Sequence, residues 1–437
     1  MFNFHLHDHT RRFFCRTGFF FCCVIPTLAV AAWCANRHTN SHTLEGEREL
    51  AEKVGVLAKI AGVEHPRPGV ILYRGVELAE PEASEPFFKA RVVEAGLNDG
   101  TFVMIASQPE IRGAQWPAVW ELLGRRLRRQ TADAGVPVRF AAAELTVHDE
   151  NGSQTFTELR GQVEPTENGT ALTVNFRLAG VDMPDPAKIR IERNRKTSPP
   201  TTSLELHTGG GALPCGMLMS PLGGAESLGR KATFRGSLWA KETPAGWEGE
   251  LSGQFAALDL GRLVGGQFPH HLSGPASITV QKAVLKQGRV EEAEGSFAAG
   301  PGVIGRSLMI SLFEQLHWEP GKLAEQAAEL TPYEQLAFSF VLDKRGLVLG
   351  GQCRDGTPGA MLETRAGALL LEPREQPQPI LNFVRALVPA SEVQIPATRE
   401  SDWLLQHLPL PKLSPPREEP TPNPASAKLH FQRSAEK

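Results

Sequence analysis

The side chains that could perform chemistry in this chain are few, and their spacing completes no familiar catalytic pattern. His270 and His271 stand side by side, but Pro269 and Gly274 flank them, so a surface turn is the expected structure. Neither Gly-x-Ser-x-Gly nor His-Glu-x-x-His occurs, and nothing in the sequence pairs a nucleophile with a base. We therefore expect no catalytic residues and a protein that is not an enzyme.

The patterns for metal and phosphate binding are also incomplete. His5, His7 and His9 alternate near the N-terminus, but no cysteine or second histidine pair completes a metal site. The glycine clusters at 209–211 and 223–224 lack the Lys-Ser/Thr of a phosphate-binding loop. The sequence thus predicts no metal and no cofactor.

Four arginines form the strongest cluster of charge. They lie in an expected helix, 116–129, and are Arg125, Arg126, Arg128 and Arg129. Such a cluster either contacts the anionic headgroups of a membrane surface or forms a solvated helix face. The whole chain has 46 Lys and Arg against 49 Asp and Glu, a balance that argues against a nucleic-acid partner.

An uncharged apolar segment, residues 17–35, follows a short stretch, 1–16, that contains several arginines. At about 1.5 Å per residue, a helix of this length spans the hydrocarbon layer of a bilayer. We expect a single-pass transmembrane helix, kinked at Pro26, with 1–16 as a cytoplasmic tail because the basic residues precede the helix. A cleaved signal peptide and a buried helix are the alternatives.

The elements that follow the anchor change from helical to extended. Residues 44–65 fit a juxtamembrane helix, because apolar residues recur at helical spacing: Leu50, Val54, Leu57, Ala58 and Ala61. From 66 to 400 the frequent glycines and prolines and a period of two predict a β-rich exported domain. This domain has a candidate division into two sub-domains near 195–230.

Three helices are expected beside the strands, and they could cover the sheet. Besides 116–129, they are 303–317, with leucines at helical spacing, and the shorter 379–388. Residues 409–437 are Pro-rich, polar and without a period, which predicts a disordered tail.

Apolar and polar side chains alternate along the central strands, as they do where one face of a sheet is buried. The turns between strands are short, so neighbouring strands should pair in sequence and antiparallel. The apolar face that we expect contains Leu172, Phe176, Phe234, Leu238, Leu251 and Phe255. These side chains either close into a dry core or line a trough for lipid tails, where each buried methylene contributes about 0.8 kcal/mol.

The expected fold class is mainly β with a few helices. An N-terminal transmembrane helix precedes a long, curved antiparallel β-sheet, shaped as a groove or a flattened barrel and covered by two or three helices. Cys215 and Cys353 either form one disulfide or remain free thiols, and the usual burial of cysteine favours free thiols.

Two stretches resemble the AsmA/TamB group of membrane-anchored envelope proteins. Residues 75–81 (GVELAEP) with 87–96 (FFKARVVEAG) are similar to the opening strands of their exported part, and 283–302 (AVLKQGRVEEAEGSFAAGPG) to their late hairpins. The likeness covers roughly residues 17–300. It implies a twisted sheet curved into a groove with an apolar lining. It also implies a cell inner membrane protein with a cytoplasmic N-terminus, a periplasmic bulk and an envelope lipid such as a phospholipid as partner.

Two hypotheses for the function follow. In the first, the chain is a non-catalytic, membrane-anchored protein that shields or transfers lipid in the cell envelope, with the bilayer as its partner. In the second, it is a structural scaffold or assembly subunit that binds other envelope proteins through the sheet and the Pro-rich tail.

Overall fold

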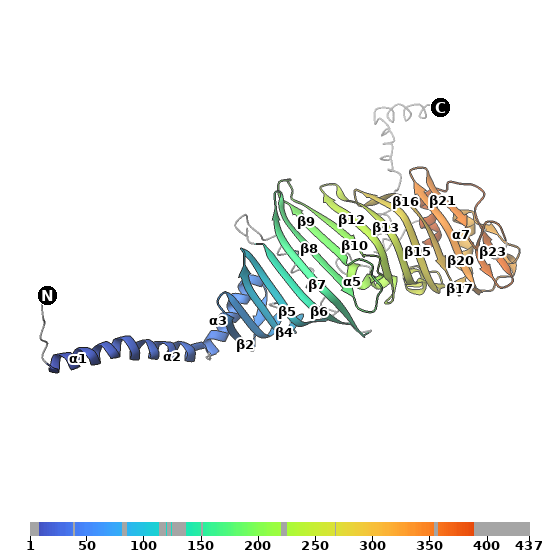
Figure 1. The fold of residues 1–437 in the computed structure, drawn as a ribbon. Helices are drawn as coiled ribbons and strands as arrows, with labels where there is room; N and C mark the ends of the chain where they lie inside the picture. Colours follow the sequence, from blue (N-terminus) through green and yellow to red (C-terminus); the bar gives the residue numbers. More distant parts are fainter. Residues whose placement is uncertain are drawn as a thin grey trace, which may run out of the picture.

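The computed structural model describes residues 8–37, 40–80, 85–112, 119, 124, 137–149, 152–219, 225–266, 268–353 and 357–388. Within them an N-terminal apolar helix leads into a mostly antiparallel sheet of 20 strands, accompanied by few helices. Figure 1 shows the helix projecting from one end of a long ribbon of strands that lie side by side. The mainly β fold class expected from the sequence is therefore confirmed.

The N-terminal helix changes its winding ahead of a proline. In chain order it consists of α1 (Asp8–Phe19), the π-helical turn η1 (Phe20–Val24) and α2 (Ile25–Arg37). Pro26 has no N–H to donate, and the Ile25 N–H donates to the Phe20 carbonyl five residues back. The Thr27 hydroxyl donates to the Cys23 carbonyl at 2.6 Å, which satisfies a second backbone group beside the proline.

The apolar window of this helix, Arg12 to Ala32, is 21 residues long and has a mean hydropathy of 1.8. None of the window is buried against the rest of the protein. Its length and composition suit a membrane anchor, and a signal sequence near the N-terminus has the same properties. The helix begins at Asp8, inside the stretch 1–16 that the sequence assigns to a tail.

The juxtamembrane helix ends earlier than the predicted 44–65, and the prediction of a helix in the second half of that range is wrong. Helix α3 (Asn40–Val54) ends where Gly55 takes a φ of +84° and donates to the Ala51 carbonyl at 2.7 Å. Strands β1 (Leu57–Lys59) and β2 (Gly62–Arg67) follow. Here Val56, Ala58 and Ile60 are buried at a period of two, whereas Leu57, which the helical spacing had placed on the apolar face, is exposed.

The long strands of the sheet are joined by short turns. The first of them are β3 (Val70–Ala79), β4 (Phe88–Asn98), β5 (Thr101–Arg112), β6 (Val138–Asp149), β7 (Gly152–Thr166), β8 (Gly169–Leu178), β9 (Ala187–Asn194) and β10 (Thr201–His207). After the short β11 (Leu213–Pro214) come β12 (Thr233–Thr243), β13 (Gly246–Asp259), β15 (Pro275–Lys286), β16 (Arg289–Ala299), β20 (Gln335–Asp343) and β21 (Gly346–Gly351). The expected hairpins form, for example where Thr166 pairs with Gly169 across Asn168.

One pairing differs from the predicted sequential antiparallel order. Strands β5 and β6 are parallel, with Phe102 opposite Val138 and Arg112 opposite His148. A parallel pair requires the chain to return across the sheet, which the connection from 113 to 137 is long enough to do. The expected helix 116–129 falls in this connection and, apart from Val119 and Gly124, lies outside the described residues.

The sheet shows no division near 195–230. Strand β10 pairs with β9 on one side and with β12 on the other, so the pairing continues through this region. The predicted split into two sub-domains there is therefore not seen in the strands. The short elements β11, α5 (Cys215–Met219) and α6 (Ala225–Leu228) lie between β10 and β12 in this region.

Bulges change which side chains face the core. Glu158 in β7 and Ala257 in β13 have positive φ angles of 54° each, and the strand register shifts at both positions. One extra residue moves all later side chains to the opposite face. Phe156, which simple alternation from Val163 places outside, is consequently buried.

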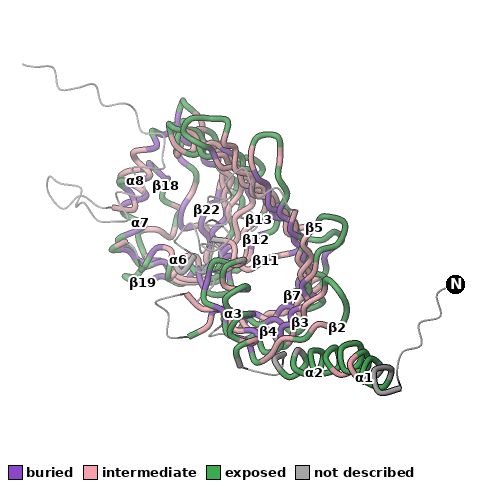
Figure 2. The backbone as a smooth tube through the Cα atoms, turned by 90° about the vertical axis from the view of Figure 1, so that its left-hand side faces the viewer, coloured by how far each residue is buried: buried purple, intermediate pink, exposed green. Residues whose placement is uncertain are grey.

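The C-terminal part adds helices and a small sheet. Strands β14 (Leu272–Ser273), β17 (Gly302–Gly305) and β19 (Leu330–Tyr333) pair with one another, and β18 (Glu319–Pro320), β22 (Ala360–Thr364) and β23 (Gly367–Leu371) end the main sheet. Helix α7 (Arg306–Leu316) starts later than the predicted 303 because Gly302–Gly305 pairs as a strand. Helix α8 (Ile380–Leu387) confirms the prediction at 379–388. Figure 2 shows the strands in an arc, with α6, α7 and α8 across from β5 and β7.

Candidate functional site

One face of the sheet carries an uninterrupted series of apolar residues from β3 to β21. They lie directly opposite one another on neighbouring strands: Ile71, Ala95, Met104, Phe140, Gly161, Val174, Ile189, Leu206, Leu238, Leu251, Ala283, Ala293, Leu342 and Leu347. We call this series the central apolar row and its side of the sheet the apolar face. The other side, the polar face, carries the neighbouring series Arg190, Glu205, Trp239 and Glu250.

All six side chains proposed from the sequence as lipid-facing lie on the apolar face, but they differ in burial. Leu172, Phe176 and Phe234 are buried. Leu238, Leu251 and Phe255 are half-buried and pack against the main core. The contact of these residues with lipid stays a prediction.

Burial on the apolar face depends on the distance from one rim of the sheet. Phe234 pairs with Leu213 of β11 on one side and with Phe255 on the other, where the two ring centroids are 4.8 Å apart. Farther along β12, Ala240 pairs with Leu204 of β10, and both side chains are half-buried. The apolar face therefore combines a closed core near β11 with accessible apolar surface near the opposite rim.

The predicted arginine cluster, Arg125, Arg126, Arg128 and Arg129, lies outside the described residues. Val119 from the same segment is described and packs against both larger core clusters. This contact places at least one point of the connection between β5 and β6 against apolar side chains of the sheet.

The prediction of a surface turn at His270 is wrong. His270 is 5% exposed, and its Nε2 lies 3.0 Å from the Ala386 carbonyl oxygen while Nδ1 lies 3.2 Å from the Ser307 hydroxyl. Because a carbonyl oxygen only accepts, Nε2 carries the proton and Nδ1 accepts from Ser307. Burial lowers the pKa of His270, and the hydrogen bond to Ala386 partly offsets this. His270 thus joins α7 to α8, while His271 is exposed.

Neither cysteine outside the N-terminal helix is placed for a catalytic or metal-binding role among the described residues. Cys215 is buried and Cys353 is half-buried, and the two form no disulfide with each other. Burial raises the pKa of Cys215 to about 11, which keeps it protonated at neutral pH. Among the described residues no group of histidine, cysteine, aspartate and glutamate is arranged to hold a metal ion.

A broad depression of about 540 Å³ lies on the polar face between β9, β10, β12 and β13. Lys188, His207 and Arg235 line it together with the glycine pair Gly236 and Gly253. The depression is open, and it lies on the side of the sheet opposite the central apolar row.

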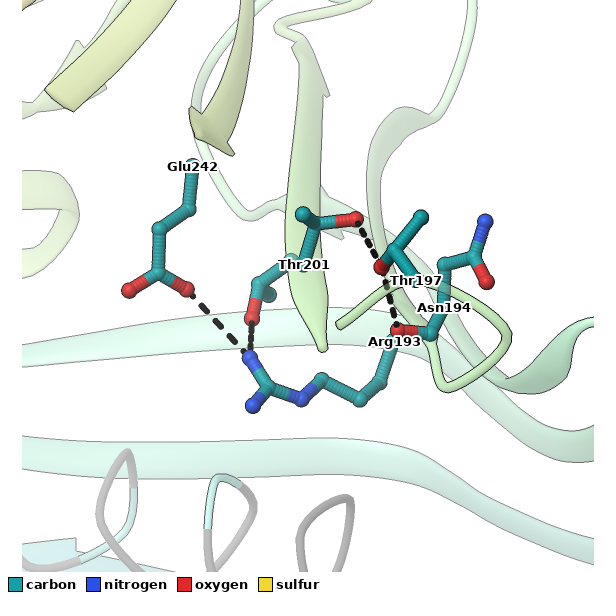
Figure 3. Close-up of polar contacts among 6 residues, drawn as sticks. Arg193, Asn194, Thr197, Thr201 and Glu242 are labelled. Carbon is teal, nitrogen blue, oxygen red and sulfur yellow. Dashed lines mark hydrogen bonds and ion pairs between the residues drawn. The ribbon is translucent and has the colours of Figure 1, made fainter. Parts of the chain in front are cut away.

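A polar pair ends the apolar face at the rim away from β11. Arg193 continues the apolar-face side of β9 after Ile189 and Ile191, and it pairs with Thr202 of β10. One guanidinium nitrogen, Nη1, donates to the Thr202 hydroxyl at 2.5 Å. The same nitrogen lies 3.3 Å from Glu242 Oε2 (Figure 3). The sequence contained the signal for this residue, since Arg193 stands two positions beyond Ile191.

The fold and these sites were compared with protein-family models, with curated proteins and with solved structures, and none of the three comparisons found a match.

Proposed function

We propose that the protein is a non-catalytic, membrane-anchored protein that shields or transfers lipid along its apolar face. The observation that carries this proposal is the central apolar row, which continues in register from β3 to β21. A dry core does not need such continuity between distant strands. An acyl chain that lies across many strands does, because every methylene that leaves water contributes about 0.8 kcal/mol.

The accessible part of the row supports the proposal. Leu238, Leu251, Ala283 and Ala293 are consecutive members of the row, and all four are half-buried. Contiguous apolar surface on a protein is normally covered by a ligand, a partner or a membrane. The N-terminal helix would hold this surface close to a bilayer, with the arginines that precede its apolar segment keeping the N-terminus in the cytoplasm.

The AsmA-like envelope family remains our proposed assignment, on the sequence stretches given above and on this architecture. The assignment would place the sheet in the periplasm of a cell with two membranes. A role as a scaffold has no comparable support, because no feature of the described residues favours a protein partner over lipid on the apolar face.

Lipid co-purification tests the proposal. The full-length protein, extracted in mild detergent, is expected to retain phospholipid that mass spectrometry detects and quantifies. The Leu238→Gln/Leu251→Gln variant places two amides on the apolar face and should retain several-fold less lipid. Its control is Trp239→Gln/Glu250→Gln, which changes the pair directly opposite one another on the polar face of the same two strands.

Circular dichroism would confirm that both variants keep their strands. Equal lipid retention in the two variants would overturn the role of the apolar face. A wild-type protein that retains no lipid and takes up none from vesicles would overturn the function as a whole.

A further inference from the structure

The rim of the apolar face holds a cation, Arg193, at the point where the apolar residues of β9 end. Arg193 follows Ile189 and Ile191 on the same side of β9, and its side chain is 20% exposed. Arg190, on the polar face of the same strand, is 37% exposed. Arg193 is therefore less exposed to solvent than the arginine on the opposite face of the same strand.

The neighbours of Arg193 on the apolar face are apolar on one side and polar on the other. Ile191 stands opposite both Leu172 and Leu204, one residue pair farther into the sheet. Arg193 itself stands opposite Thr170 and Thr202, at the rim. The side chains on this face change from apolar to polar between Ile191 and Arg193, two residues or about 7 Å along the strand. This change matches the boundary between the acyl chains and the headgroup of a lipid.

The hydrogen bonds of Arg193 leave part of its guanidinium available. The contacts of its guanidinium with Thr202 and with Glu242 both involve Nη1. Within the described residues, Nε and Nη2 make no hydrogen bond, although a guanidinium can donate five. Glu242 is 48% exposed, so its carboxylate can turn to water without loss of a buried contact.

We propose that Arg193 and Thr202 bind the anionic headgroup of a lipid whose acyl chains lie against Ile191, Leu172 and Leu204. The headgroup phosphate accepts from Nε and Nη2 in the paired geometry that guanidinium groups favour, and it competes with Glu242 for Nη1. This inference deepens the proposed function and rests on it, since it assigns a headgroup class and a position to the lipid on the apolar face.

An anionic lipid fits the site better than a free phosphate ion. A free ion gains only the charged hydrogen bonds, and at a half-exposed rim it competes with water and with Glu242 for them. A lipid adds the burial of its acyl chains beside the same arginine, and this term favours binding irrespective of the headgroup. The arginine then decides which headgroup is retained.

Vesicle binding with matched lipids tests the site. Full-length protein held in nanodiscs of neutral lipid is mixed with vesicles of phosphatidylglycerol or of phosphatidylcholine that have identical acyl chains. Mass spectrometry then measures the transfer of each lipid from the vesicles to the protein. Arg193→Gln should lower the affinity for phosphatidylglycerol about ten-fold, the scale of one charged hydrogen bond, and leave that for phosphatidylcholine nearly unchanged. Glu242→Gln should raise the affinity for phosphatidylglycerol, because it removes the competing carboxylate.

Arg190→Gln is the matched control, since it removes the same charge from the polar face of the same strand. If Arg193→Gln and Arg190→Gln change the ratio of the two lipids equally, the headgroup site is overturned while the apolar face stands. If inorganic phosphate displaces phosphatidylglycerol at equal concentration, the site binds an ion and not a lipid. If wild-type protein takes up neither lipid, the proposed function and this site both fall.

Discussion

The side chain of Gln376 makes the two backbone hydrogen bonds to Leu349 that a neighbouring strand would make. Its Nε2 donates to the Leu349 carbonyl oxygen at 2.6 Å, and its Oε1 accepts the Leu349 N–H at 2.8 Å. The same edge of β21 is satisfied at Leu347 by the backbone of Gln378, and at Gly351 by the Glu372 carboxylate. The segment 372–378 therefore covers an edge that would otherwise accept a further strand.

We expect Gln376→Leu to open this edge. The variant loses both hydrogen bonds to Leu349, and the free energy of unfolding should fall by about 1–2 kcal/mol. The unpaired backbone groups should also promote association between copies, which light scattering after size-exclusion chromatography would detect in the detergent-solubilised protein. Gln326→Leu, at the exposed end of η4 (Ala324–Gln326), is the control and should alter neither quantity. A monomeric, fully stable Gln376→Leu protein would contradict the assignment.

The ring of Phe140 lies over Gly161 on the adjacent strand of the central apolar row. A Cβ atom built on Gly161 would overlap the Phe140 ring. Gly161→Ala should therefore destabilise the protein by about 1–3 kcal/mol, as overpacking of a core does. Phe140→Leu in the same chain should recover part of this loss, and a double-mutant cycle of chemical denaturation would measure the coupling. Additive effects would show that the ring has room to move away.

His270 should make stability depend on pH. Its pKa is lowered in the folded state by burial, so the unfolded chain, with a value of about 6.5, binds the proton more readily. The stabilisation is thus complete above about pH 6.5 and is lost as the pH falls towards the folded-state pKa. His270→Gln cannot titrate, so the stability advantage of wild type over the variant should shrink between about pH 7.5 and pH 5.

Thermal or chemical unfolding at a series of pH values measures this difference. His271→Gln alters the exposed neighbour and should leave the pH profile of wild type unchanged. A constant difference between wild type and His270→Gln over the whole range would show that His270 is not buried in its neutral form.

Cys215 should resist thiol reagents in the folded protein. Burial protects the sulfur and raises its pKa to about 11, so the reactive thiolate is scarce at neutral pH. Cys353 is half-buried and should be alkylated faster. Iodoacetamide labelling followed by peptide mass spectrometry would compare the two sites, with denatured protein as the control in which the rates become similar. Faster labelling of Cys215 in the native protein would contradict its burial.

The face of each long strand was predictable because alternation is a local property. Leu172 and Phe176 share one face, as do Leu238 and Phe234, and two-residue counting alone places them. Counting fails where a bulge intervenes, as at Glu158, because nothing in the local sequence announces the extra residue. The degree of burial was also beyond reach, since Phe234 pairs with Leu213 of β11, a strand outside its own hairpin, as well as with Phe255.

The contacts that sequence reasoning missed join distant parts of the chain. His270 accepts from a residue 37 positions away and donates to one 116 positions away, so its local setting between a proline and a glycine suggested only a turn. The parallel pairing of β5 with β6 was missed for the same reason, because the connection between them carries no signal of its destination. Arg193 was different: the alternation that located its apolar neighbours would have located it too.

The succession of hairpins has a consequence for how the molecule is made. From β6 to β10 each strand finds its partner in the segment synthesised just before it, so the sheet can grow in the direction of synthesis without waiting for remote sequence. The last pairings to be completed are those of 372–378 with β21. During synthesis, the newest strand therefore exposes an unpaired edge until residues 372–378 have been made. Truncation of the chain before residue 372 would leave the edge of β21 permanently unpaired.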